Sequence, residues 1–80
     1  MITVAQLRAA RALLGWSQAE LAKSSGVAIA TIKRMEGARG LPKTAVENLW
    51  KVQQALQAAG VIFIEENDEG PGVRFRKQRD

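Results

Sequence analysis

The stretch WSQAELAKSSGVAIATIKRMEG, residues 16–37, predicts two short helices joined by a tight turn. Ser17 can cap the first helix, and Glu20, three residues later, completes a capping box. Gly26 ends that helix, because glycine readily adopts the positive φ that such a turn needs. A second helix then runs from about Ala28 to Glu36. Two helices in this order predict a helix-turn-helix, a motif that places its second helix in the major groove of DNA.

A projection of the second helix at about 100° per residue separates two faces. Ile32 and Met35 fall on one side together with Ala28, and we expect that side to enter the core. The candidate base-facing residues are Ala28, Ile29, Ala30, Lys33 and Arg34. Arginine can donate two hydrogen bonds to guanine, and small apolar side chains can touch thymine methyl groups. An ordinary solvated face is the alternative, but an isoleucine between small residues fits it poorly.

The spacing Q-x-x-L-A-x-x-x-G-V-x-x-x-T-I-x-x-x-E-G, from Gln18 to Gly37, resembles the phage repressor and Cro family, also called XRE or lambda-repressor-like. The upstream LRAARALLGWSQ fits the first helix of that family, so the resemblance covers about residues 3–56. It implies a mainly α bundle of about four helices that binds double-stranded DNA. One departure is Ala28, where the family commonly has Ser, Thr or Asp, which predicts a weak cap.

The resemblance also implies contacts outside the second helix. The candidate phosphate contacts are Gln18, Lys23, Arg39 and Lys43. Relatives use a glutamine amide at the Gln18 position to hold a phosphate, and Arg39 and Lys43 flank the exit of the second helix. Arg11 and Glu36 match a structural ion pair of the family. Phosphate contacts position a protein on DNA but read no sequence.

The flanking segments predict further helices and a hairpin. Thr3 can cap a first helix with Gln6 in the capping-box position, and a last helix is expected from about residue 44 to 59. The apolar stripe expected on that last helix is Val46, Leu49, Val52 and Leu56. Residues 61–64 and 73–76 predict two strands joined by EENDEGPG. We therefore expect a DNA-binding domain over residues 1–60 and a hairpin with a basic tail over residues 61–80.

A two-stranded hairpin is only marginally stable by itself, so it should pack on the helices, pair with a second copy, or do both. The candidate dimer interface comprises Trp50, Leu56, Ile62, Ile64, Val73 and Phe75. Trp50 lies next to the expected stripe and could equally be a core residue or an interface residue. Trp16 precedes a cap, where an apolar residue usually packs into the core.

Composition narrows the function classes. Eighty residues suffice for one small domain, and the chain has no cysteine and no histidine. Without these residues the usual bases, nucleophiles and zinc ligands are missing, so we expect neither an enzyme nor a metal or other cofactor. The absence of a long apolar run predicts a soluble cytoplasmic protein without membrane contact. The first 64 residues carry eight Lys or Arg against three Glu, a net charge of +5, which suits a polyanionic partner.

These observations leave two candidate functions for the protein. The first is a sequence-specific DNA-binding transcriptional regulator that acts as a homodimer on a two-fold symmetric operator, with its second helices in grooves about 34 Å apart. The second is a protein-interaction module, an antiactivator or antitoxin, that binds a partner protein through the exposed isoleucine or the hairpin edge. A pure protein binder would not need the basic set Lys33, Arg34, Arg39 and Lys43.

Overall fold

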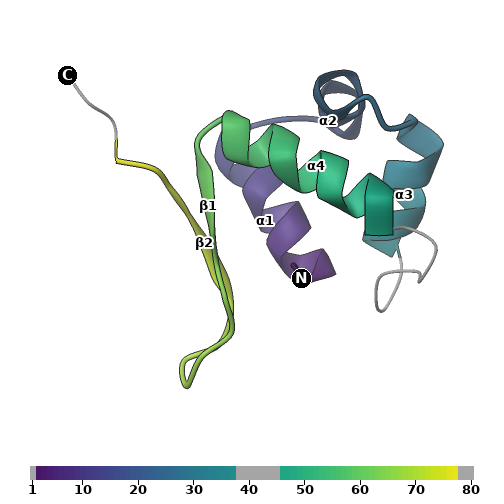
Figure 1. Cartoon of the computed structure of the whole chain (residues 1–80). Coiled ribbons are helices and arrows are strands. Elements are labelled where there is room, and N and C mark those ends of the chain that lie inside the picture. The colour runs from purple at the N-terminus through teal and green to yellow at the C-terminus, as the bar shows by residue number, and fades with distance from the viewer. Residues whose placement is uncertain (1, 38–45, 78–80) are drawn as a thin grey trace.

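The computed structural model describes residues 2–37 and 46–77. Its elements are α1 (Val4–Leu14), α2 (Gln18–Ser25), α3 (Ile29–Gly37), α4 (Val46–Ala58), β1 (Val61–Ile64) and β2 (Gly72–Phe75). The mainly helical fold with a C-terminal antiparallel hairpin is the predicted one. In Figure 1, α3 and the hairpin lie at opposite ends of the molecule, with α1 and α4 between them.

Capping boxes begin the first two helices, as the sequence predicted. The Thr3 hydroxyl accepts a hydrogen bond from the backbone N–H of Gln6 at 3.0 Å, and Gln6 Oε1 accepts one from the backbone N–H of Thr3 at 2.9 Å. Ser17 and Glu20 make the same reciprocal pair at the start of α2, with both bonds at 3.0 Å. Gly26 follows α2 with φ 75°, the left-handed conformation that lets the chain turn sharply into α3.

The core lies where the inner faces of all four helices meet the first strand. Its fully buried side chains include Leu7 of α1, Leu21 of α2, Ile32 of α3, Leu56 of α4 and Val61 of β1. Trp16 is partly buried and packs against this cluster, as expected for a residue before a cap.

Two side chains expected in the core are outside it. Val46 is 53% exposed, because the inward face of α4 is formed by Leu49, Val52 and Leu56 instead. Ala28 is also exposed. Ala28 precedes the first turn of α3, and its carbonyl accepts hydrogen bonds from the backbone N–H groups of Thr31 and Ile32. Because Ala28 lies before the helix, a helical projection does not predict the direction of its side chain.

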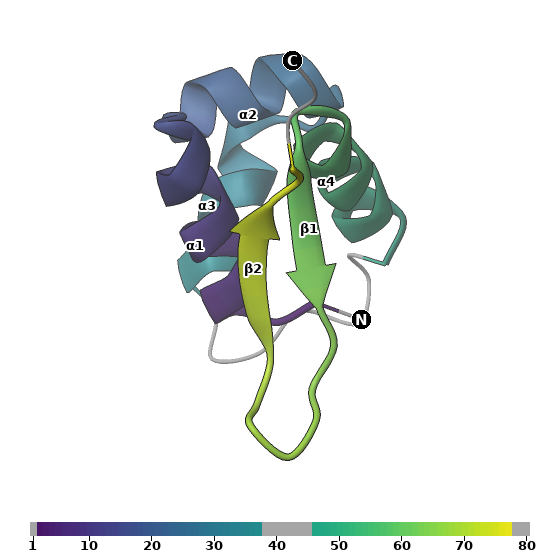
Figure 2. The same cartoon turned by 90° about the vertical axis from the view of Figure 1, so that its left-hand side faces the viewer.

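The hairpin lies across one side of the helices with β2 beside α1 and β1 beside α4 (Figure 2). Val61 pairs with Phe75 and Phe63 with Val73, so these four side chains share one face. That face is the inner one, because Val61 is fully buried and Phe63 and Val73 pack against the core. Ile62 and Ile64 therefore point to the outer face.

This arrangement corrects the expected dimer interface. Leu56 is 0% exposed, so it is unavailable to a second copy. Val73 belongs to the inner face and packs against the core of its own chain. Trp50, Phe75, Ile62 and Ile64 retain exposed surface, with Trp50 at 61% and Phe75 at 50%.

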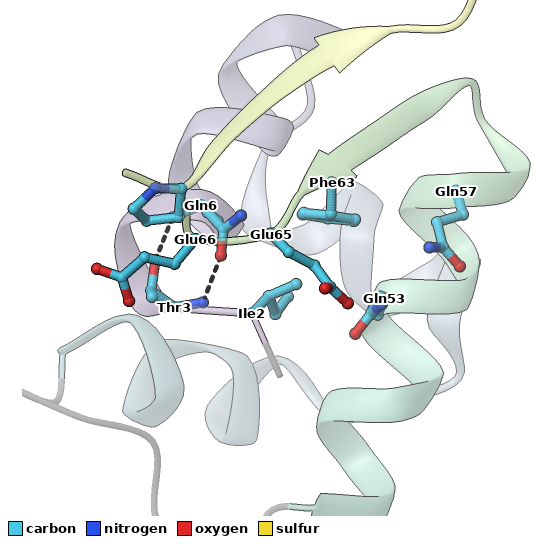
Figure 3. A pocket seen from close by; sticks show the side chains of 9 residues that line it. Ile2, Thr3, Gln6, Gln53, Gln57, Phe63, Glu65 and Glu66 are labelled. Carbon is cyan, nitrogen blue, oxygen red and sulfur yellow. Dashed lines mark hydrogen bonds between the residues drawn. The ribbon is translucent and has the colours of Figure 1, made fainter. Parts of the chain in front are cut away.

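A buried glutamine attaches the hairpin to the first helix. Gln6 is only 6% exposed, and its Nε2 donates to the carbonyls of Ile64 and Gly72, both at 2.9 Å. The Oε1 of the same side chain accepts a hydrogen bond from the backbone N–H of Thr3 (Figure 3). One amide group therefore completes the α1 cap and holds the two strands of the hairpin at their turn end.

Candidate nucleic-acid interface

Helix α3 presents an exposed stripe opposite its buried side. Ile32 and Met35 are 0% and 1% exposed and anchor the helix to the core. The stripe on the other side consists of Ile29, Ala30, Lys33 and Arg34, all exposed, with Ile29 at 39%. These are four of the five residues predicted to face bases, and the fifth, Ala28, lies exposed just before the helix. The helix therefore combines apolar and cationic side chains on one accessible face.

Arg34 is held near the helix surface by its own turn. Its Nη2 donates to the Thr31 hydroxyl at 3.2 Å, while the rest of the guanidinium remains exposed. A guanidinium has five N–H donors in a fixed fork, so this contact leaves donors for a bidentate acceptor. Lys33 is exposed beside it. The pair gives the stripe two positive charges at the C-terminal half of α3.

The start of α3 has an alanine where a side-chain cap would stand. Ala28 has no oxygen or nitrogen in its side chain, so it cannot bind the first amides of the helix. Helix α2 differs, since Ser17 and Glu20 form its capping box. Glu20 also puts a negative charge in the first turn of α2. The start of α3 is thus better suited to an anion than the start of α2.

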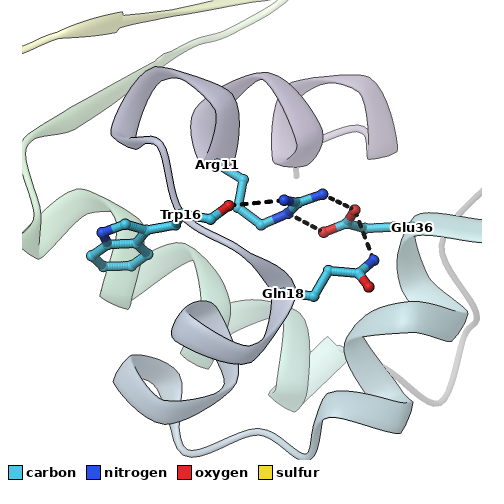
Figure 4. A network of polar contacts seen from close by, with 4 residues as sticks. All are labelled: Arg11, Trp16, Gln18 and Glu36. Atoms are coloured by element: carbon cyan, nitrogen blue, oxygen red, sulfur yellow. Dashed lines mark hydrogen bonds and ion pairs between the residues drawn. The ribbon is translucent and has the colours of Figure 1, made fainter.

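A network of charged and polar groups ties α1 to the ends of α2 and α3 (Figure 4). Arg11 Nε donates to Glu36 Oε2 at 2.8 Å, and Nη2 donates to Glu36 Oε1 at 2.7 Å, a bidentate pair. The Arg11 Nη1 donates to the Trp16 carbonyl at 2.9 Å. Gln18 Nε2 adds a longer bond to Glu36 Oε1 at 3.2 Å. The ion pair expected between Arg11 and Glu36 is present.

The carboxylate at the centre of this network is buried yet ionised. Burial acts to raise the pKa of Glu36, whose side chain is only 5% exposed. Hydrogen bonds from Arg11 and Gln18 and the positive charges of the arginines act against burial and hold the Glu36 pKa below its usual range. The hydrogen bond to Glu36 in turn raises the pKa of Arg11. Both partners therefore stay charged, and the network fixes the end of α3 against the start of α2.

The candidate phosphate contacts do not form a single cluster. Gln18 is half-buried in the network, where its Nε2 donates to the buried Glu36 near the end of α3. Lys23 is exposed and lines a hollow with Trp16, Glu20 and Ser24. Five residues separate it from Gln18, which places it about 140° away around the helix. Lys23 is thus turned away from the Gln18 side, and Arg39 and Lys43 lie outside the described residues.

Within residues 2–37 and 46–77, no three or more acidic side chains gather as metal ligands would. In the same residues, no helix has the length and apolar character to cross a membrane.

A family model described as a helix-turn-helix domain matches residues 4–61. Since this match covers most of the 80-residue chain, the protein belongs to the helix-turn-helix domain family. Membership in this class indicates a DNA-binding regulator in general terms, with DNA as partner. A comparison with curated proteins found no match. Residues beyond 61, which include most of the hairpin, lie outside the family match.

Proposed function

We propose that this protein is a sequence-specific DNA-binding transcriptional regulator of the phage repressor and Cro type. The observation that carries the proposal is the exposed stripe Ile29, Ala30, Lys33 and Arg34 on a helix anchored by buried side chains. Such a helix fits the major groove, where Arg34 reads guanine and Ile29 meets a thymine methyl group. Lys33 and Gln18 contact phosphates and fix the register.

The network around Glu36 supports this assignment. It joins Arg11 of α1 to Glu36 of α3 at 2.7 Å and Gln18 of α2 to the same carboxylate at 3.2 Å. A helix that reads bases must be held rigidly, because misplacement by a fraction of an ångström weakens bidentate hydrogen bonds. Arg11 therefore acts as a positioning residue for the interface and does not itself contact DNA.

We further propose that the regulator works as a homodimer on a two-fold symmetric operator. One recognition helix reads few bases, and tethering two half-site contacts multiplies affinity. The proposed regulator acts in the cytoplasm on chromosomal DNA, needs no cofactor, and carries out no reaction of its own.

The proposal is tested by binding assays on duplexes selected from a random pool. Arg34→Ala should cost about 1–3 kcal/mol on the selected duplex and relax preference at one base position per half-site. Lys51→Ala is a matched control, because Lys51 is an exposed lysine on α4 that does not belong to the stripe, and its loss removes the same charge. Equal losses for Arg34→Ala on selected and random DNA would show that Arg34 touches only phosphate.

A second candidate function is a protein-interaction module, favoured by the exposed side of α4. Trp50 and Val46 are 61% and 53% exposed and lie one helical turn apart. Aromatic residues are enriched at protein interfaces. If this side of α4 binds a partner protein, Trp50→Ala abolishes the regulatory function in cells while DNA binding is unchanged.

A further inference from the structure

The outer face of the hairpin faces the viewer in Figure 2, with no other element of the described chain in front of it. Ile62 and Ile64 lie on this face, because they alternate with the inward Val61 and Phe63. Gly72 pairs with Ile64, and Ile64 Cδ1 lies 3.7 Å from where a Cβ on Gly72 would stand. The Ile64 side chain thus lies over the glycine and extends an apolar strip across both strands.

The two ends of the hairpin carry opposite charges. Its turn contains four exposed acidic residues, Glu65, Glu66, Asp68 and Glu69. At the other end, Arg74, Arg76 and Lys77 are exposed. Arg74 pairs with Ile62 across the ladder and so shares the outer face. The hairpin is therefore apolar in the middle, negative at its turn and positive at its open end.

We propose that a second copy of this chain packs on the outer face with its hairpin antiparallel to the first. In that orientation, Ile62 and Ile64 meet their counterparts, and the acidic turn of each copy lies against the basic end of the other. A two-fold axis across the strands generates this arrangement, so the same patch serves both copies. A parallel arrangement would bring acidic turn to acidic turn and basic end to basic end, and such like-charge contacts suppress an association.

The surface is small, and this determines how the dimer behaves. The strands have four residues each, so the face is well below the area of a standard protein interface. The association is therefore weak without DNA and is weakened further by salt, which screens the charged ends. Binding of both copies to one duplex strengthens it.

The position of the hairpin also sets the spacing of the operator. Since α3 and the hairpin lie at opposite ends of the molecule (Figures 1 and 2), a hairpin-to-hairpin dimer carries its two α3 helices at its far ends. The half-site spacing should therefore be wider than for a dimer whose copies meet close to α3. This inference deepens the proposed homodimer, and its surface can be tested without DNA.

Two pairs of charge reversals test the antiparallel arrangement by sedimentation at low salt. The turn variant combines Asp68→Lys with Glu69→Lys, two exposed residues of the turn outside the hollow that Glu65 and Glu66 line beside α1 and α4. The end variant combines Arg74→Glu with Arg76→Glu. Each variant by itself should dissociate with a constant raised at least roughly tenfold, because like charges then meet at both ends. An equimolar mixture of the two should form heterodimers, and the chain with all four reversals should dimerise again. Glu47→Lys with Lys51→Glu reverses an exposed pair on α4 and should change nothing.

All of these side chains are exposed, so circular dichroism should show the same fold in every variant. A wild-type chain that stays monomeric throughout the concentration series would overturn the proposal. So would single reversals that associate as well as the wild type, or a four-fold reversal that fails to restore the dimer. These results concern the hairpin alone, because loss of sequence-specific DNA binding is measured separately through Arg34.

Discussion

Replacement of Arg11 by methionine should destabilise the protein and reverse the pH dependence that Glu36 contributes. Methionine keeps the length of the apolar stem but removes three donors, two to the Glu36 carboxylate and one to the Trp16 carbonyl. The Glu36 side chain, 5% exposed, is then left with the 3.2 Å bond from Gln18. Breaking a buried pair from one side costs about 3–5 kcal/mol. An 80-residue domain has a total stability of about 4–12 kcal/mol, so the loss is a large part of it.

The sign of the pH effect follows from the direction of the Glu36 pKa. In the wild type this pKa is lowered, so its stabilising effect is full above the ordinary value of 4.5 and is lost as pH falls through the folded pKa. Without Arg11, burial dominates and raises the pKa, so the variant regains stability as the pH falls and the carboxyl takes up a proton. Urea unfolding at several pH values measures both effects.

Two further variants make the result interpretable. Lys51→Met removes an exposed positive charge from α4 that does not act on Glu36, and it should cost less than about 0.5 kcal/mol. The double variant Arg11→Met with Glu36→Met should recover much of the loss, because an apolar pair of similar volume replaces the ions. Arg11→Met as stable as the wild type at pH 7, or with an unchanged pH profile, would refute the reasoning.

Three other changes have expected outcomes. Gln6→Leu removes three hydrogen bonds at about 1 kcal/mol each. The hairpin should then open before the helices do, so backbone amides in β1 and β2 should exchange hydrogen faster than those in the helices. Equally fast exchange in strands and helices would argue against attachment of the hairpin through Gln6. Gly26→Ala should cost about 1 kcal/mol in a thermal melt because of its φ of 75°, and a neutral result would mean that the turn relaxes. Lys43→Ala should reduce the slope of log affinity against log salt by about one; an unchanged slope would remove Lys43 from the phosphate contacts.

The sequence predicted those features that depend on neighbouring residues. Capping boxes join residues three apart, so Thr3 with Gln6 and Ser17 with Glu20 could be recognised directly. The exposed stripe of α3 followed from helical periodicity. The ion pair between Arg11 and Glu36 joins residues 25 apart and was predicted only through the family resemblance.

Features that depend on packing between distant segments were missed. The contacts of Gln6 with Ile64 and Gly72 span 58 and 66 residues, and no local pattern signals them. Alternation along a strand separates two faces but does not say which face turns inward, so Val73 was assigned to the interface. Leu56 was assigned twice, to the core stripe and to the interface, and its burial in the helical core decides between them.

Selection of bound duplexes from a random pool tests most directly whether α3 reads DNA sequence. The wild-type chain should enrich a short motif, and Arg34→Ala should lose preference at one position of that motif while keeping the others. The control Lys51→Ala should enrich the same motif as the wild type. A wild-type pool that stays as random as the input would contradict the account.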